Sequence, residues 1–372
     1  MNMRHVFVFF GKIHAKIQFS FRIFELQFKN TEKMILVTGG TGLVGGHLLW
    51  HLLQENDRVT AVRRSSSDLK PLRTIFSFYT SKPDDFLSRI DWKIGDVVNE
   101  VSLRDAMQSV SFVYHCAAVV SLGNNSDIMS DTNVIGTRNI IKAAQENGIK
   151  KLCFVSSIAA CGRAFENERI DENYIWTDSS NRSLYSRSKY YSEQEVWKGI
   201  RKGLNAVIVN PGVILGISGT NTGSSQLFSQ VQKGLMFYTN GGTGYVDVRD
   251  VVKAMLQLMK SEISGERFVL VGENCSNKDV LSWIADGFGK RRPIIAIGKQ
   301  ALWLVGALSE FLGKVFHFYP VINRVTARTA TNREYYSSLK IEDAIGINFT
   351  PIEQCIHGVC DFRLKENSTY QN

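Results

Sequence analysis

Hydrophobic and polar positions follow two alternating patterns along the chain from Met34 to about residue 215. Short, nearly continuous apolar runs of strand length are separated by stretches in which apolar residues recur at helical spacing. The runs lie at residues 34–38, 58–62, 90–94, 111–117, 151–157 and 205–211, and helices are predicted at 127–148 and 183–203. Repeated strand–helix units with such apolar strands predict an α/β fold, in which helices cover both faces of a doubly wound parallel sheet.

The pattern changes after residue 215, and this divides the chain into three parts. We expect residues 34–215 to form the main domain and 216–372 a smaller, mainly helical C-terminal domain. Late strands near 245–271 are predicted to rejoin the sheet of the main domain. Since Met34 opens the first strand, we expect the natural start there and regard residues 1–33 as an extension outside the fold.

A glycine-rich turn, "TGGTGLVGG", connects the first predicted strand to the first helix. Its glycines at 39, 42 and 45 permit the turn and let the backbone approach a pyrophosphate, which the helix N-terminus can bind. The turn predicts a Rossmann dinucleotide-binding domain at 34–215, with the cofactor lying along one short segment. That segment consists of Gly39, Thr41, Gly42, Leu43, Val44 and Gly45.

The end of the second strand indicates which dinucleotide is bound. It carries Arg63 and Arg64 and no acidic residue, at the distance from the glycines where a ribose-binding residue is expected. Because a guanidinium binds a 2′-phosphate and a carboxylate repels it, NADP(H) is favoured and NAD(H) is the alternative.

The ends of the next two strands carry further candidate cofactor contacts. Asp96, followed by Val97, is placed to hydrogen-bond an adenine amino group at the carboxyl end of the third strand. Ala117 and Ala118 follow the fourth strand, where small side chains would let the cofactor lie against the backbone.

Seven motifs occur in an order that resembles one superfamily. They are "TGGTGLVG", "GDV", "HCAA", "NVIGT", "SSIAACG", "YSRSK" and "NPGVILG". In this order they resemble the extended short-chain dehydrogenase/reductase superfamily, which includes the NAD-dependent epimerase/dehydratase family, and most of all its dihydroflavonol-reductase-like branch. The resemblance runs from Met34 to about residue 360. It implies that residues 216–372 are the substrate-binding domain.

The resemblance also implies roles for individual residues. Tyr185 and Lys189 of "YSRSK" would carry out acid–base catalysis and contact the cofactor, and Ser157 would orient the reacting carbonyl. Asn133 would shape the site and relay protons. Since a free tyrosine has a pKa of about 10, we expect the Lys189 ammonium to lower the pKa of Tyr185.

Two further segments follow from the same comparison. Residues Pro211, Gly212 and Val213 match the segment that contacts the nicotinamide in similar proteins. A second tyrosine–lysine pair at the same spacing, Tyr336 and Lys340, has no serine-bearing strand before it. We therefore expect Tyr336 to have a structural role.

Three functions are compatible with these residues. The first is an NAD(P)-dependent oxidoreductase that transfers hydride between the nicotinamide and a carbonyl or alcohol of a small, apolar substrate. Nucleotide-sugar dehydratases of the superfamily carry an Asp-Glu pair after the catalytic serine, whereas this chain has Ile158 and Ala159. An epimerase that holds NAD tightly is a second candidate. A non-catalytic NADP(H)-sensing regulator is a third, although such proteins typically lose the tyrosine–lysine pair.

Composition and charge bear mainly on the partners. The net charge is +9, of which residues 1–33 contribute six Lys or Arg against two Glu. A mildly basic surface and a phosphate-bearing ligand account for the rest, and no nucleic-acid partner is expected. The six cysteines form no CxxC pair, which predicts reduced thiols in a cytoplasmic protein and no metal site. A homodimer is common among similar proteins.

One apolar stretch, "ALWLVGALSEFLGKVFHF" at residues 301–318, is too short for a transmembrane helix. Its polar residues fall on one helix face. A packed helix, an apolar lid over a hydrophobic substrate, and a helix that touches a membrane surface all fit this pattern.

Overall fold

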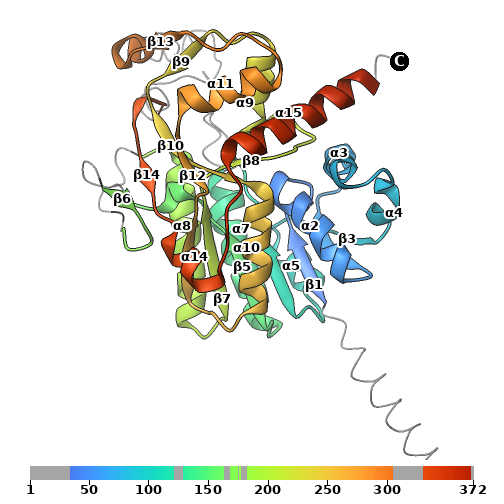
Figure 1. The fold of residues 1–372 in the computed structure, drawn as a ribbon. Coiled ribbons are helices and arrows are strands. Elements are labelled where there is room, and N and C mark those ends of the chain that lie inside the picture. The colour runs from blue at the N-terminus through green and yellow to red at the C-terminus, as the bar shows by residue number, and fades with distance from the viewer. Residues whose placement is uncertain are drawn as a thin grey trace, which may run out of the picture. The chain divides into compact units, whose positions relative to one another are not determined.

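Each of the six predicted apolar runs forms a strand of one parallel sheet, confirming the predicted fold class (Figure 1). The structure is a computed structural model that describes residues 34–120, 129–162, 168–174, 176, 182–304 and 330–369. The strands are β1 (Ile35–Thr38), β2 (Val59–Arg63), β3 (Ile90–Ile94), β4 (Phe112–His115), β5 (Lys151–Val155), β7 (Ala206–Pro211) and β11 (Glu266–Leu270). The strand order is β11-β7-β5-β4-β1-β2-β3. Strands β2 and β3 thus extend the sheet on one side of β1, whereas β4, β5, β7 and β11 extend it on the other side. In open α/β sheets, ligands bind outside the carboxyl ends of the strands at such a point.

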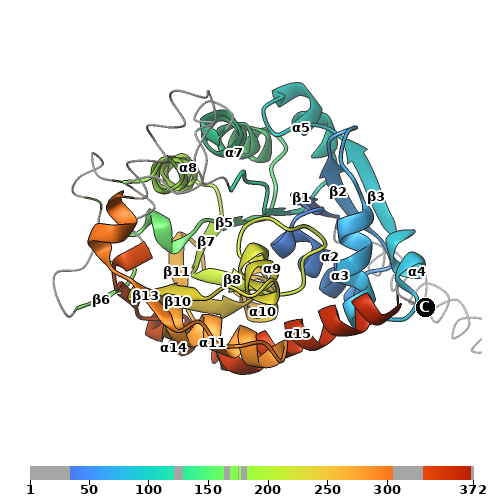
Figure 2. The same cartoon turned by 90° about the horizontal axis from the view of Figure 1, so that it is seen from above.

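Helices cover both faces of this sheet, as the doubly wound prediction requires (Figure 2). One face packs against α2 (Leu43–Glu55), α10 (Val248–Lys260) and α14 (Leu339–Ile345). The other packs against α5 (Glu100–Ala106), α7 (Gly136–Glu146) and α8 (Leu184–Arg201). Leu49, Met255 and Phe268 belong to the first core, and Ile140, Phe154 and Val196 to the second. The central strands therefore have no face that is exposed to solvent, which explains their nearly continuous apolar sequences.

Short connecting elements complete this half of the fold. Between β2 and β3 lie α3 (Lys70–Tyr79) and α4 (Pro83–Leu87). The predicted helix 127–148 is helical from residue 129 in its described part, contains a π-helical turn, η1 (Asp131–Ile135), and continues as α7. A short 3-10 turn, η2 (Ile158–Ala160), follows β5.

Beyond the main sheet, the later residues combine helices with short strands. A three-stranded sheet contains β8 (Val213–Leu215), β10 (Gly242–Asp247) and β12 (Glu273–Ser276). Helices α9 (Ser225–Gln232), α11 (Asn277–Gly287) and α15 (Ile352–Thr369) pack beside it around a separate core that includes Phe228, Ile284 and Ile356. Of the late strands expected near 245–271, β11 joins the main sheet, whereas β10 lies in the three-stranded one.

Two pairs of very short strands remain. β9 (Phe237–Thr239) pairs with β13 (Ile295–Ile297), and β6 (Arg169–Ile170) pairs with β14 (Tyr335–Tyr336). The expected extension 1–33 and the part of the predicted helix 301–318 after residue 304 lie outside the described residues. In the described part of the chain, no helix has the length and apolar character needed to cross a membrane.

Candidate active site

The glycine-rich turn is shaped by close backbone approaches. Gly39 has φ of +71°, and a Cβ there would lie 2.6 Å from the backbone nitrogen of Ala117. At Gly45 a Cβ would lie 2.2 Å from the carbonyl oxygen of Gly39. Gly42 precedes α2, and no side chain caps that helix. Because the first N–H groups of a helix lack intrahelical partners, the start of α2 presents donors to an anion.

A cavity of about 610 Å³ opens at the carboxyl ends of the central strands. It brings together most of the site residues predicted from the sequence, which lie on five separate segments. The predicted residues that line it are Gly39, Thr41, Gly42, Leu43, Val44, Gly45, Ala118, Ser157, Tyr185, Lys189, Pro211, Gly212 and Val213. Six others do not line it, namely Arg63, Arg64, Asp96, Val97, Ala117 and Asn133.

The cavity also has walls that the sequence reasoning missed. Their members come from the ends of β4 and β5, the start of α8, the loop 218–225, β10 and the neighbourhood of β14. They include Cys116, Val120, Val155, Arg182, Ser218, Thr220, Thr222, Thr243, Glu334 and Tyr336. The loop was recognisable from its Gly, Ser and Thr content directly after "NPGVILG", whereas no local signal marks Thr243 or Glu334.

Tyr185 lies in the cavity in hydrogen-bonding contact with Ser157. Burial raises the pKa of Tyr185 above its ordinary value, and the hydrogen bond with Ser157 offsets part of that rise. We expected Lys189 to lower this pKa, but the cost of burying the phenolate outweighs other effects. Tyr185 is therefore a protonated hydroxyl at neutral pH, which suits a proton donor.

Ser157 and its neighbour Ser156 have different hydrogen-bond partners. The Ser157 hydroxyl accepts a hydrogen bond from the backbone N–H of Ala159 at 3.1 Å and contacts Tyr185. The Ser156 hydroxyl instead donates to a carboxylate oxygen of Glu193 at 2.8 Å. Of the two adjacent serines, only Ser157 is thus hydrogen-bonded to the tyrosine.

Lys189 is buried beneath the cavity, one helical turn beyond Tyr185. Its Nζ donates a hydrogen bond to the carbonyl oxygen of Val155 at 2.9 Å and lies 5.5 Å from the ring centroid of Phe154. Burial lowers the pKa of Lys189 to about 8, and the nearby Cys116 and Glu193 oppose this shift. The amine is still mostly protonated at pH 7 and places a positive charge one helical turn from the tyrosine.

A buried carboxylate, that of Glu193, connects α8, the helix of Tyr185 and Lys189, to residues at three strands. It accepts hydrogen bonds from Ser156, from Nδ2 of Asn210 at 2.8 Å and from Nη1 of Arg267 at 3.0 Å. The Nδ2 of Asn210 also donates to the carbonyl oxygen of Ser157 at 2.9 Å. Both of these bonds come from the side-chain amide of Asn210. In the structure it fixes the Ser157 backbone to α8.

Asn133 lies behind the cavity wall. Its Nδ2 donates to the Ser188 hydroxyl at 3.0 Å and to the Val119 carbonyl at 3.1 Å, and its Oδ1 accepts from the Val119 N–H at 2.8 Å. These bonds hold the segment after β4 against α8. They account for a shaping role, while proton relay through Asn133 stays a prediction.

The predicted cofactor-selecting residues lie at the ends of β2 and β3. Arg63 is half-buried with its guanidinium carbon 5.9 Å from the ring centroid of Trp92, and its Nε is buried without a hydrogen-bond partner. Arg64 is exposed. Asp96 accepts a hydrogen bond from the Val98 N–H at 3.1 Å. An unsatisfied buried guanidinium donor is costly, so an anionic ligand at this end of the sheet would stabilise Arg63.

The second tyrosine–lysine pair is split in space. Tyr336 is buried against Ile158 and Val271, and its hydroxyl donates to Glu334 at 3.2 Å. The Nζ of Lys340 binds the Glu266 carboxylate at 2.6 Å, away from Tyr336. The expected structural role of Tyr336 agrees with this packing, but Tyr336 also lines the cavity.

Comparison with known proteins decides the family. Residues 35–272 match the family model described as the NAD dependent epimerase/dehydratase family. The chain belongs to this family. It is 31% identical over 332 residues to a putative dihydroflavonol 4-reductase of Synechocystis, covering 86% of this chain and 91% of the relative. It is also 31% identical to sterol demethylase protein B of Methylococcus capsulatus, covering 76% of this chain and 82% of the relative.

Solved structures of the epimerase/dehydratase family and its relatives share the fold. The crystal structure of gox2253 has a TM-score of 0.75 and 27% identity, covering 90% of this chain and 98% of that chain. UDP-glucose 4-epimerase of Thermus thermophilus in complex with NAD has a TM-score of 0.68 and 21% identity, covering 89% of this chain and 99% of that chain. The protein is an NAD(P)-dependent oxidoreductase of the extended short-chain dehydrogenase/reductase superfamily.

The residues of this family member fit a nicotinamide dinucleotide. The uncapped start of α2 and the glycine cradle suit a pyrophosphate, and the unsatisfied Nε of Arg63 suits a negatively charged group. When bound, the reduced cofactor would supply a hydride.

Proposed function

We propose that this protein reduces the carbonyl group of a small, largely apolar substrate with NADPH, through Ser157, Tyr185 and Lys189. The observation that carries the proposal is a single cavity that contains both the phosphate-binding turn and these three side chains. We further propose that residues from 216 onward supply much of the substrate-binding wall, because Thr243, Glu334 and Tyr336 line the same cavity.

The three side chains divide the work by their chemistry. The hydroxyls of Ser157 and Tyr185 orient the carbonyl oxygen of the substrate. Tyr185, protonated because burial raises its pKa, gives its proton to the oxygen as negative charge develops there. The Lys189 ammonium stabilises the tyrosinate that remains, and its bond to Val155 fixes the ammonium in place.

The wall beside Ser157 supports an apolar substrate. Ile158 and Ala159 line the cavity directly after the serine, with Val120 and Val213 on other segments. Glu334 is the single acidic residue among the described residues of the wall. Relatives named cinnamoyl-CoA reductase, from Petunia hybrida, and sterol demethylase protein B act, by their names, on molecules with apolar ring systems. Ring-bearing ketones and aldehydes are accordingly the substrate class that we propose.

A direct assay of NADPH oxidation tests the proposed reaction. The purified protein is incubated with NADPH and a panel of aromatic and alicyclic aldehydes and ketones, and absorbance of the reduced cofactor is followed. We expect turnover with at least one apolar carbonyl and none with nucleotide sugars. Conversion of nucleotide sugars alone, detected by chromatography and without net oxidation of NADPH, would instead identify an epimerase.

The preference for NADP(H) rests on Arg63 and Arg64. Fluorescence titration should give a lower Kd for NADPH than for NADH, and the double variant Arg63→Ala/Arg64→Ala should lose at least about tenfold in NADPH affinity because charge-assisted bonds are removed. Arg58→Ala, an exposed arginine at the start of β2 paired with Asp91, is the matched control. Tighter binding of NADH by the unmodified protein would contradict the preference.

We also propose a cytoplasmic location. All six cysteines are free thiols, and five of them are buried. Free thiols persist in reducing compartments. Fractionation of cells that express the protein should place it on the cytoplasmic side, and recovery from an oxidising compartment would contradict the proposal.

A further inference from the structure

An apolar surface is formed by β9, β13 and the residues directly before them. Met236, Phe237, Ile294 and Ile295 are adjacent, because Ile295 pairs with Phe237 and the N–H groups of Ile294 and Ile295 both donate to the carbonyl of Met236. Their exposed fractions are 54%, 44%, 78% and 41%. We call these four residues the apolar strand pair. Large apolar side chains that gather on an exposed surface mark a site of interaction.

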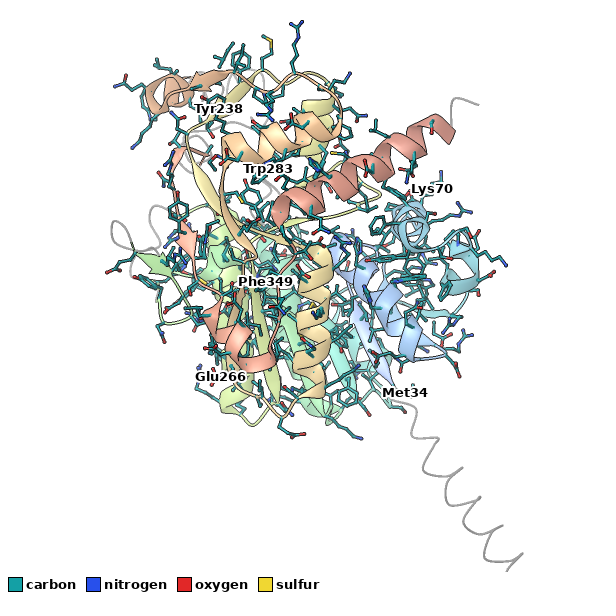
Figure 3. All side chains as sticks on the ribbon, in the orientation of Figure 1. Met34, Lys70, Tyr238, Glu266, Trp283 and Phe349 are labelled. Atoms are coloured by element: carbon teal, nitrogen blue, oxygen red, sulfur yellow. The ribbon has the colours of Figure 1, made fainter. Side chains whose placement is uncertain are left out.

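This surface lies at one end of the molecule. β9 and β13 are placed beyond α9 and α11, away from the main sheet (Figure 1). Figure 3 shows the same arrangement, with Tyr238 of β9 beyond Trp283 of α11 and far from Glu266 of β11. The main sheet therefore does not cover the apolar strand pair.

Basic residues flank β9 and β13 in the sequence, and we call them the basic rim. Lys233, Lys290, Arg291 and Lys299 are exposed, and none of them forms an ion pair with another described residue. Arg292 differs from them, since it binds Asp286 at 2.8 Å. The two stretches that carry the surface, residues 233–240 and 290–304, contain no acidic residue at all.

Positive charge in the sequence is concentrated in a few segments, one of which begins with the residues of this surface. Residues 290–333 contain eight Lys and Arg residues and one Glu, a net charge of +7 in a chain of net charge +9. With the +4 of residues 1–33 also set aside, all other residues together carry −2. Along the sequence, the basic character is therefore concentrated in residues 290–333 and 1–33, and the four exposed cations Lys233, Lys290, Arg291 and Lys299 are the described residues that bring it to this surface.

We propose that the apolar strand pair and its basic rim dock on a membrane surface that contains anionic phospholipid. Exposed Met, Phe and Ile side chains can enter the boundary between headgroups and acyl chains while the surrounding cations contact lipid phosphates. Insertion of apolar side chains and attraction of cations to lipid phosphates, each weak alone, together give peripheral membrane binding without a membrane-spanning helix.

Other occupants fit the surface less well. A two-fold contact between copies of this chain would bring Lys290 and Arg291 close to the same residues of the second copy, and facing like charges oppose association. Nucleic acid would match the charge but not the apolar centre, since nucleic-acid interfaces are polar.

Vesicle flotation with the full-length protein tests the proposal. Vesicles of phosphatidylcholine alone are compared with vesicles that contain about one third phosphatidylglycerol, at low and high salt. We expect binding to the anionic vesicles, weakened by salt, and little binding to the neutral ones. Lys290→Glu/Arg291→Glu and, separately, Phe237→Ser/Ile294→Ser should each weaken the partition coefficient at least about tenfold.

Controls separate docking from misfolding. The charge-matched variant Lys150→Glu/Lys202→Glu changes two exposed lysines, one directly before β5 and one directly after α8, and should bind vesicles like the unmodified protein. All variants should retain their affinity for NADPH, which reports an intact fold. Failure to bind anionic vesicles, equal binding to neutral vesicles, or equal binding by all variants would overturn the proposal. Dissociation of an oligomer by the Phe237→Ser/Ile294→Ser variant, without vesicle binding, would show that the surface joins two copies instead.

Discussion

Replacing Lys189 by methionine should stabilise the folded protein at pH 7 while removing a catalytic group. Burial lowers the pKa of Lys189 from 10.5 to about 8, a difference of about 2.5 units, which corresponds to about 3 kcal/mol of unfavourable free energy while the amine is charged in both states. The variant loses the bond to Val155 and leaves that carbonyl unsatisfied, at a cost of about 1–2 kcal/mol. The expected net gain at pH 7 is therefore about 1–2 kcal/mol.

The pH dependence gives the sharper test. Since the folded pKa is the lower one, the unfolded chain binds more protons between pH 8 and 10.5, and the unmodified protein gains stability as pH rises through this window. The stability difference between variant and unmodified protein should shift by about 3 kcal/mol against the variant and change sign. Urea unfolding followed by tryptophan fluorescence at pH 7, 9 and 10.5 measures it, with Lys253→Met on the exposed side of α10 as control. A stability difference that is constant over this pH range would contradict a lowered pKa of buried Lys189.

Three further substitutions test other parts of the structure. Glu193→Leu leaves the guanidinium of Arg267 in the core without its carboxylate partner. The free energy of unfolding, measured by urea titration, should fall by about 3–5 kcal/mol. A loss below about 1 kcal/mol would contradict the stabilising role of the Glu193–Arg267 pair. Gly45→Ala forces a Cβ to within 2.2 Å of the Gly39 carbonyl oxygen and should abolish NADPH binding in fluorescence titrations; unchanged affinity would show that the turn adjusts. Gly358→Ala, inside α15 with no atom within 4 Å of the new Cβ, should instead raise stability by about 0.5–1 kcal/mol, and a lower midpoint in thermal unfolding would contradict this.

The fold was predictable because the signal for it is local. Strands such as β5 and β7 are buried on both faces, so their sequences are apolar at every position and can be recognised without a partner. The glycine turn was also recognisable, because Gly45 contacts the carbonyl of Gly39 within one strand–helix unit, although the contact of Gly39 with Ala117 after β4 is not local. β8, β10 and β12 were harder, because strands of three to six residues that pair far apart in sequence have little pattern of their own.

The candidate site was only partly predictable, for the same reason. Ser157, Tyr185 and Lys189 belong to motifs with fixed spacing, and the structure places all three on one cavity. Glu193 looks in the sequence like an ordinary surface residue of a helix, and only the approach of Asn210 and Arg267 from other strands makes it a buried connector. Such contacts depend on the tertiary arrangement and leave no trace in local spacing.

The pKa of Tyr185 shows a second limit to what the sequence can predict. A lysine four residues away suggested a lowered pKa for Tyr185, since residues at that spacing share a helix face. The structure shows instead that the Lys189 ammonium is bound to the carbonyl of Val155 and that burial dominates the environment of the phenol. Spacing identified the partners, but the direction of the shift depended on solvent exclusion by the whole cavity wall.

The central claim is that Tyr185 donates the proton in carbonyl reduction, and one comparison tests it most directly. Oxidation of NADPH with the best apolar carbonyl is measured for Tyr185→Phe and for Tyr190→Phe, a tyrosine on the same helix that stacks on Trp176 and does not line the cavity. We predict that Tyr185→Phe lowers kcat by about 10²–10⁴-fold with the Kd for NADPH nearly unchanged, while Tyr190→Phe retains activity. A Tyr185→Phe enzyme with near-normal kcat would contradict the assignment.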